Sequence, residues 1–71
     1  MITFNSKGAT GNIFYVLSEA RKIMQKERRI TEYNNMWEEV QKCESYEAAL
    51  EIIGQHIPLH DTATGKEYGN V

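Results

Sequence analysis

The chain has 71 residues, of which 41% are hydrophobic and 25% charged, and it carries a net charge of −2 at pH 7. This length predicts one small domain over residues 1–71, with its core within 2–57 and a tail over 58–71. A single cysteine, Cys43, excludes a disulfide within the chain, and no apolar run approaches the roughly 20 residues of a membrane span.

The N-terminal third predicts a strand and then a helix. Ile2-Thr3-Phe4 alternate apolar and polar side chains before the breaker Asn5-Ser6-Lys7-Gly8, a pattern typical of a short strand. Thr10 or Asn12 is suited to cap the following helix, because either side chain accepts a hydrogen bond from a free N–H of the first turn. The apolar stripe of that helix recurs at steps of three and four: Ile13, Val16, Leu17, Ala20, Ile23 and Met24.

Two further helices are predicted in the middle of the chain. Helical spacing of apolar residues from Ile30 to Cys43 indicates the second helix, with Thr31 as its N-cap. Because no glycine or proline separates it from the first, one continuous helix through residue 28 is the alternative. Ser45 is expected to cap a third helix, and Gly54 is expected to end it in a left-handed conformation.

The tail carries Pro58, which stops the third helix, and a turn signal at Thr64-Gly65. It fits either a hairpin that joins the N-terminal strand in a small sheet or a loose extension that depends on a partner. The expected fold is therefore mostly α: a small three-helix domain with a short N-terminal strand and an irregular or hairpin C-terminal tail.

The loop before the first helix is the principal candidate site. The first N–H groups of a helix lack intrahelical partners and carry partial positive charge, and glycines let the backbone approach an anion closely. We expect this loop to hold a phosphate, and a valine at Gly11 to block it without unfolding the chain. The alternative is a turn that only caps the helix. The loop residues assigned to the site are Lys7, Gly8, Gly11 and Asn12.

Three residues of the first helix complete the predicted ligand site. Tyr15 lies off the apolar stripe, one turn from the glycines, where its ring would stack on a base. Arg21 or Lys22, within a basic cluster that extends to Arg29, would pair with phosphate. The alternatives are an exposed tyrosine of a protein interface and a solvated basic helix end.

Charge is divided unevenly along the chain. Residues 1–29 hold six basic and two acidic residues, a net charge of +4, whereas residues 30–71 hold two basic and eight acidic residues, a net charge of −6. This division favours pairing between the halves or between subunits, and the acidic balance disfavours duplex nucleic acid as a partner. Because so small a core is marginal alone, a homo-oligomer is expected.

Catalytic and metal-binding patterns are lacking in the sequence. No nucleophile elbow, paired acidic motif or phosphate-transfer signature is present. We therefore expect the protein not to be an enzyme and to use no cofactor. His56 and His60 have the i, i+4 spacing of helical metal ligands, but Pro58 lies between them and no second ligand pair is visible, so no metal site is predicted.

Two short patterns resemble a known family. The run Gly8-Ala9-Thr10-Gly11-Asn12-Ile13-Phe14 with Leu17, and the later Ser45-Tyr46-Glu47-Ala48-Ala49-Leu50, resemble short reading frames of phages and prophages. The resemblance covers roughly residues 2–57. It implies a mobile-element origin and an accessory role exercised by stoichiometric binding.

Two functions follow from the loop, the basic cluster and this resemblance. The first is a non-enzymatic phage accessory protein that binds and sequesters a phosphate-bearing nucleotide signal of host defence. The alternative is a protein-interaction module that inhibits a host protein through its acidic second and third helices. Either would act in the host cytoplasm, because a lone cysteine and the absence of a signal peptide indicate a reducing compartment away from the membrane.

Overall fold

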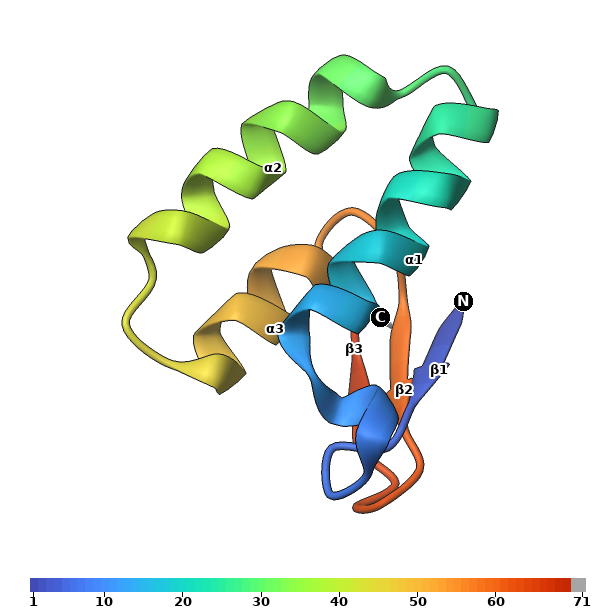
Figure 1. The fold of residues 1–71 in the computed structure, drawn as a ribbon, viewed down its shortest axis with the longest axis vertical. Helices are drawn as coiled ribbons and strands as arrows, with labels where there is room; N and C mark the ends of the chain where they lie inside the picture. The colour runs from blue at the N-terminus through green and yellow to red at the C-terminus, as the bar shows by residue number, and fades with distance from the viewer. Residues whose placement is uncertain (70–71) are drawn as a thin grey trace.

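The computed structural model describes residues 1–69 and contains three helices and a small sheet (Figure 1). This confirms the mostly α domain with an N-terminal strand. The tail folds as a hairpin rather than as a loose extension. In chain order the elements are β1 (Ile2–Phe4), a 3₁₀ turn η1 (Ala9–Gly11), α1 (Ile13–Lys26), α2 (Ile30–Lys42), α3 (Tyr46–Gly54), β2 (Leu59–Asp61) and β3 (Glu67–Tyr68).

The sheet has the order β1-β2-β3, so the C-terminal hairpin places its first strand in the centre. β1 pairs with β2 in parallel, and β2 pairs with β3 antiparallel. Figure 1 shows α1 and α3 lying over the sheet, with α2 across both of them. The two outer strands leave two sheet edges, of which β1 forms one.

The two faces of the sheet differ in polarity. Ile2, Phe4 and Leu59 point into the core, where Tyr68 joins them from β3. The intervening residues form a cross-strand row on the other face: Thr3, His60 and Glu67. This alternation is what the period of two in a strand requires when helices cover only one face of an antiparallel or mixed sheet.

The apolar stripe predicted for the first helix is the centre of the core. Val16, Ala20 and Met24 have no measurable exposure, and Leu17 is 3% exposed. Ile13 and Ile23 flank this stripe and are partly buried. α2 adds Met36 and α3 adds Leu50 and Ile53 from the opposite side. The periodicity of the sequence therefore identified the buried face of α1 correctly.

Asn12, rather than Thr10, caps α1. The Asn12 side-chain Oδ1 accepts a hydrogen bond of 2.8 Å from the N–H of Phe14. Thr10 instead lies in η1, and its hydroxyl accepts the N–H of Asn5 at 2.8 Å. Asn12 therefore caps the helix, and Thr10 closes the loop that precedes it.

α1 and α2 are separate helices because the chain reverses at Arg28, which adopts φ = 61°. The N–H of Arg29 donates to the carbonyl of Met24, and the N–H of Arg28 donates to that of Gln25. This pair of bonds is a Schellman motif, which usually has glycine at the left-handed position. No glycine marks this break in the sequence, and for that reason the sequence alone leaves a continuous helix open.

We expect Arg28→Gly to raise the melting temperature. A non-glycine residue in the left-handed region costs about 1–2 kcal/mol, and the added chain entropy of glycine offsets about half of this gain. The net stabilisation of up to about 1 kcal/mol corresponds to a rise of about 4–8 °C in a domain of this size. Arg28→Ala is the control, because it removes the side chain but keeps the strained φ. A glycine variant that melts with the alanine variant would contradict this account.

The prediction of Thr31 as N-cap of the second helix is wrong. The helix starts at Ile30, and the preceding Arg29 makes no capping bond through its side chain. Arg29 instead donates two hydrogen bonds to the carboxylate of Glu32, at 3.1 and 2.7 Å, and one to the carbonyl of His56 at 2.9 Å. The guanidinium thereby connects the start of α2 to the end of α3. These hydrogen bonds hold the start of α2 in place without a side-chain N-cap.

The prediction that Gly54 ends the third helix in a left-handed conformation is wrong, because Gly54 is the last residue of α3 and Gln55 follows in the right-handed region. The φ of Gly54 is not positive, and the positive-φ glycines are Gly65 and Gly69. A Cβ at Gly54 would lie 2.7 Å from the Cβ of Tyr68. Glycine is thus required here by the close approach of β3 to the helix. By contrast, Ser45 caps α3 as predicted, accepting the N–H of Ala48 at 3.0 Å.

Candidate functional site

The loop before α1 is closed on itself by hydrogen bonds. The N–H of Gly8 donates to the carbonyl of Asn5, and the N–H of Gly11 donates to the carbonyl of Gly8, both at 3.0 Å. The N–H of Lys7 donates to the side chain of Asn5 at 3.0 Å. The expectation that Gly8 and Gly11 offer free N–H groups to an anion is therefore wrong, because short-range turns already use those donors.

Gly11 is needed for packing within this loop. A Cβ at Gly11 would lie 2.6 Å from the carbonyl oxygen of Asn5 and 2.8 Å from the backbone of Ser6. Valine at Gly11 would consequently displace backbone atoms, so the expectation that it blocks a ligand without disturbing the fold is also wrong. The hydroxyl of Tyr46 donates to the Gly11 carbonyl, which fixes the loop against α3.

The predicted residues of α1 do not meet at one site. Tyr15 is half-buried against the core, and with Glu19 and Ile23 it lines a groove beside β1. Lys22 lies on the same flank and forms an ion pair with Glu19 at 3.4 Å. Arg21 is exposed, six residues after Tyr15, which places it about 120° away around the helix. Of the seven predicted residues, only Lys7 lines the cleft between the loop after β1, α3 and the hairpin.

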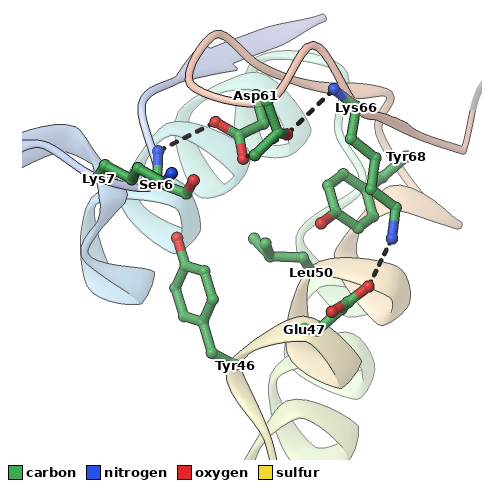
Figure 2. A pocket seen from close by; sticks show the side chains of 9 residues that line it. Ser6, Lys7, Tyr46, Glu47, Leu50, Asp61, Lys66 and Tyr68 are labelled. Atoms are coloured by element: carbon green, nitrogen blue, oxygen red, sulfur yellow. Dashed lines mark hydrogen bonds and ion pairs between the residues drawn. The ribbon is translucent and has the colours of Figure 1, made fainter.

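That cleft lies between the loop after β1, the start of α3 and the β2–β3 hairpin (Figure 2). Its volume is about 420 Å³, within the range of small-molecule sites. Leu50 lies between the two aromatic rings in Figure 2. The other lining residues are polar, charged or aromatic: Ser6, Lys7, Tyr46, Glu47, Asp61, Thr64, Lys66 and Tyr68.

α3 and β3 supply the rings and one charge pair of the cleft. Tyr46 is the first residue of α3 and is 40% exposed, so its ring forms one wall. Lys66 pairs with Glu47 at 2.5 Å and lies 4.9 Å from the centre of the Tyr68 ring. The hydrogen bond that the Lys66 ammonium group donates to the Glu47 carboxylate raises the pKa of Lys66. The positive charge of Lys66 is therefore already balanced by the carboxylate of Glu47.

Lys7 is the cation of the cleft without such a partner. Within residues 1–69, no ion pair involves its ammonium group, and the residue is exposed at the rim. The first turn of α3 lies across the cleft from it, and the positive end of a helix dipole favours an anion. The cleft therefore combines one free cation with the exposed ring of Tyr46, which are groups suited to bind an anionic ring compound, beside the carboxylates of Glu47 and Asp61.

Asp61 links the loop after β1 to the turn between β2 and β3 at the rim of the cleft. It is 3% exposed, and its Oδ1 accepts the N–H groups of Ser6 at 3.1 Å and Ala63 at 2.9 Å. Its Oδ2 accepts the hydroxyl of Thr64 at 3.1 Å. Burial alone would raise the pKa of Asp61, but these hydrogen bonds together outweigh it and lower the pKa to about 2.

We expect stability to fall as pH decreases from about 5 to about 2. The hydrogen bond from Arg29, followed by that from His56, lowers the pKa of Glu32 to about 2, so Glu32 and Asp61 both bind protons less readily when folded. Their contribution is complete above their unfolded pKa values and is lost as pH falls through the folded ones. Melting temperatures measured across this range, with Asp61→Asn as control, provide the test.

The Asp61→Asn variant should be less stable at pH 7 and should show a shallower loss of melting temperature in acid. Asparagine keeps an acceptor oxygen but loses the charge that the N–H groups of Ser6 and Ala63 stabilise. Parallel curves for wild type and variant would show that Asp61 does not contribute to the acid transition.

The two histidines face different carboxylates. His56 Nδ1 lies 2.7 Å from Glu32, and His60 Nδ1 lies 3.3 Å from Glu67. Among the described residues, no group of three or more histidine, cysteine or acidic side chains could hold a metal ion. The structure thus gives each histidine a role in linking elements: His56 joins α3 to α2, and His60 joins the two strands of the hairpin.

Sequence reasoning missed Tyr46, Lys66 and Tyr68. Tyr46 stands out in the sequence only as part of the run Ser45–Leu50, and the other two lie in the tail, for which the sequence leaves a hairpin and a loose extension open. The turn signal at Thr64-Gly65 was the one local sign that the hairpin would bring Lys66 and Tyr68 back to α3. Residues this far apart in the chain become neighbours only through strand pairing.

Comparisons with known proteins identify no relative: no family model, curated protein or solved structure matches the chain significantly. In the described part of the chain, no helix combines the length and apolar character that crossing a membrane requires. The geometry of the cleft and of the exposed surfaces is therefore the basis for the functional argument.

Proposed function

We propose that the protein is a non-enzymatic binding protein that holds a phosphate-bearing nucleotide in the cleft of Figure 2. The observation that carries this proposal is the combination of the unpaired Lys7 with the exposed ring of Tyr46 in a cleft of about 420 Å³. A lysine attracts phosphate as a point charge, and a tyrosine face accepts a base by stacking.

The proposal places the ligand beside the glycine loop rather than on it. The loop still matters, because its internal hydrogen bonds hold Lys7 at the rim, and the Tyr46 hydroxyl anchors it to α3. A pre-formed rim reduces the entropy that ligand binding must overcome. Tyr15, Arg21 and Lys22 contribute to other surfaces.

The biological role that we propose is sequestration. The patterns at Gly8–Phe14 and Ser45–Leu50 resemble short phage and prophage proteins, and a small stoichiometric binder suits removal of a nucleotide signal of host defence. Such a protein would act in the cytoplasm of the host and would associate with further copies of itself.

Lys7→Ala should weaken nucleotide binding at least about tenfold, and the difference should shrink as salt rises, because exposed charges are screened. Calorimetry with a panel of nucleoside monophosphates, cyclic dinucleotides and ADP-ribose would measure it. Lys42→Ala is the matched control, since Lys42 is an exposed lysine at the end of α2 outside the cleft.

Two results would contradict the nucleotide proposal. One is that no member of the panel binds the wild-type protein; the other is that Lys7→Ala and Lys42→Ala bind equally well. In either case the second candidate, inhibition of a host protein by direct binding, takes precedence.

A specific observation favours that second candidate. Phe14 is 66% exposed and lies against Trp37, with ring centres 6.5 Å apart, on the surface of the α1–α2 hairpin. Ile30, also on α2, is 37% exposed. Exposed aromatic groups of this kind mark protein-binding surfaces more often than chance surface residues do. Glu38 and Glu39, two acidic residues of the second helix, which is expected to meet the host protein, are exposed.

A further inference from the structure

The cleft of Figure 2 is lined by two cations and two carboxylates. Lys7 and Lys66 supply the positive charges, and Glu47 and Asp61 supply the negative ones, so the lining residues carry no net charge. An anion in this cleft is attracted by the lysines and repelled by the carboxylates. The balance between these charges therefore limits how many phosphate groups a ligand can bring into the cleft.

The ammonium group of Lys66 is already engaged by Glu47. It donates a hydrogen bond of 2.5 Å to that carboxylate, and its side chain crosses from the hairpin to the first turn of α3 (Figure 2). The same ammonium group lies 4.9 Å from the centre of the Tyr68 ring, and an aromatic face attracts a cation at this distance. Of these two partners, Glu47 is the one that cancels the charge of Lys66.

Asp61 adds a carboxylate that no cation of residues 1–69 balances through an ion pair. Its oxygens accept hydrogen bonds from Ser6, Ala63 and Thr64, which are neutral donors. Together these bonds outweigh the effect of burial and lower its pKa to about 2, so Asp61 is charged at neutral pH. Because Ser6 directly precedes Lys7, this negative charge lies close to the loop that carries the free cation.

One phosphate is the number that these charges accommodate. Within the described residues, Lys7 is the cation of the cleft that no ion pair occupies, so a first phosphate is bound there. In a nucleoside diphosphate, the second phosphate is linked directly to the first and shares the cleft with the remaining charges. Those charges are the Glu47–Lys66 pair and Asp61, whose sum is negative, so the second phosphate is repelled.

We infer that the Glu47–Lys66 ion pair restricts the cleft to ligands with a single phosphate group, so that the ligand class is a nucleoside monophosphate. This inference rests on the nucleotide binding proposed above and identifies Glu47 as the residue that sets its selectivity. With one free cation and the exposed ring of Tyr46, the cleft offers one position for a phosphate and one for a base. Cyclic dinucleotides and ADP-ribose, which carry two phosphates, are then weaker ligands.

Glu47→Gln should open the cleft to a second phosphate. Glutamine removes the negative charge and keeps the length of the side chain, so the charge of Lys66 is no longer cancelled. The Tyr68 ring still attracts the Lys66 ammonium group, which therefore stays in the cleft. Because the Glu47 side chain is 61% exposed, loss of this ion pair should leave the protein folded.

Calorimetry with matched nucleoside mono- and diphosphates measures the selectivity. The probes are AMP, GMP, CMP and UMP and the corresponding diphosphates, in the absence of divalent cations, which would neutralise the second phosphate. The wild type should bind a monophosphate at least as tightly as its diphosphate. Glu47→Gln should shift the ratio of the two affinities at least about tenfold toward the diphosphate, and the shift should shrink as salt rises.

Two further variants connect this shift to the ion pair. Glu51→Gln makes the same charge change one turn further along α3, at an exposed residue that does not line the cleft, and should keep the ratio of the wild type. Glu47→Gln combined with Lys66→Met removes both charges of the pair, and the ratio should return to that of the wild type. Circular dichroism checks that each variant is folded.

The outcomes distinguish selectivity from nucleotide binding itself. A wild type that binds diphosphates more tightly than monophosphates overturns the single-phosphate selectivity and leaves nucleotide binding standing, as does a Glu47→Gln variant with an unchanged ratio. An equal shift in Glu51→Gln also overturns the selectivity, because the overall charge would then be its cause. A wild type that binds none of these probes overturns both proposals.

Discussion

Leu17→Ala is expected to destabilise the protein by about 2–5 kcal/mol, the range for a large-to-small change in a packed core. Leu17 is 3% exposed and lies on the buried stripe of α1 beside Val16 and Ala20. A domain of this size rarely has more than about 3–5 kcal/mol of stability in its core. The variant should therefore be substantially unfolded at 37 °C, a common assay temperature, as measured by denaturant titration followed by circular dichroism.

Two controls make this result specific to packing. Leu17→Met conserves volume and should cost less than about 1.5 kcal/mol. Ser18→Ala, at an exposed neighbouring position, should change stability by no more than about 0.5 kcal/mol. If Leu17→Ala and Ser18→Ala melt alike, α1 does not bury the face assigned to it.

Gly54→Val is expected to have the second large effect, with Gly54→Ala between it and the wild type. A Cβ at this position would lie 2.7 Å from the Cβ of Tyr68 and 3.0 Å from its carbonyl carbon. Overpacking of this kind costs about 1–3 kcal/mol. Helix propensity acts in the opposite direction, because alanine is favoured over glycine by about 1 kcal/mol in a helix.

The sign of the Gly54→Ala effect therefore distinguishes the two influences. A lower melting temperature indicates that the steric clash between α3 and β3 outweighs the gain in helix propensity. A higher melting temperature indicates that the hairpin moves away easily. Gly8→Ala is the control for a glycine-to-alanine change, because its Cβ would meet only the side chain of Asn5, at 3.2 Å. That variant should retain nearly the full stability of the wild type.

The candidate site was only partly predictable from the sequence. Lys7, which the sequence assigns to a phosphate site on the glycine loop, lies at the rim of the cleft, but the N–H groups of Gly8 and Gly11 are used within the loop. Whether a turn donates its N–H groups inward or outward depends on the hydrogen bonds formed by residues such as Asn5 and Thr10, and composition does not specify them. Tyr15 and Arg21 were grouped by closeness in sequence, although helical geometry separates them.

The helices, their buried faces and the cap at Ser45 could be predicted from the amino-acid sequence, because they depend on periodicity and on bonds between near neighbours. The role of Gly54 and the position of the hairpin are seen in the folded chain alone. Each of these depends on contacts between distant segments, which overrule the weak local preferences of single residues. The cleft belongs to the same class, since its walls come from three segments brought together by strand pairing.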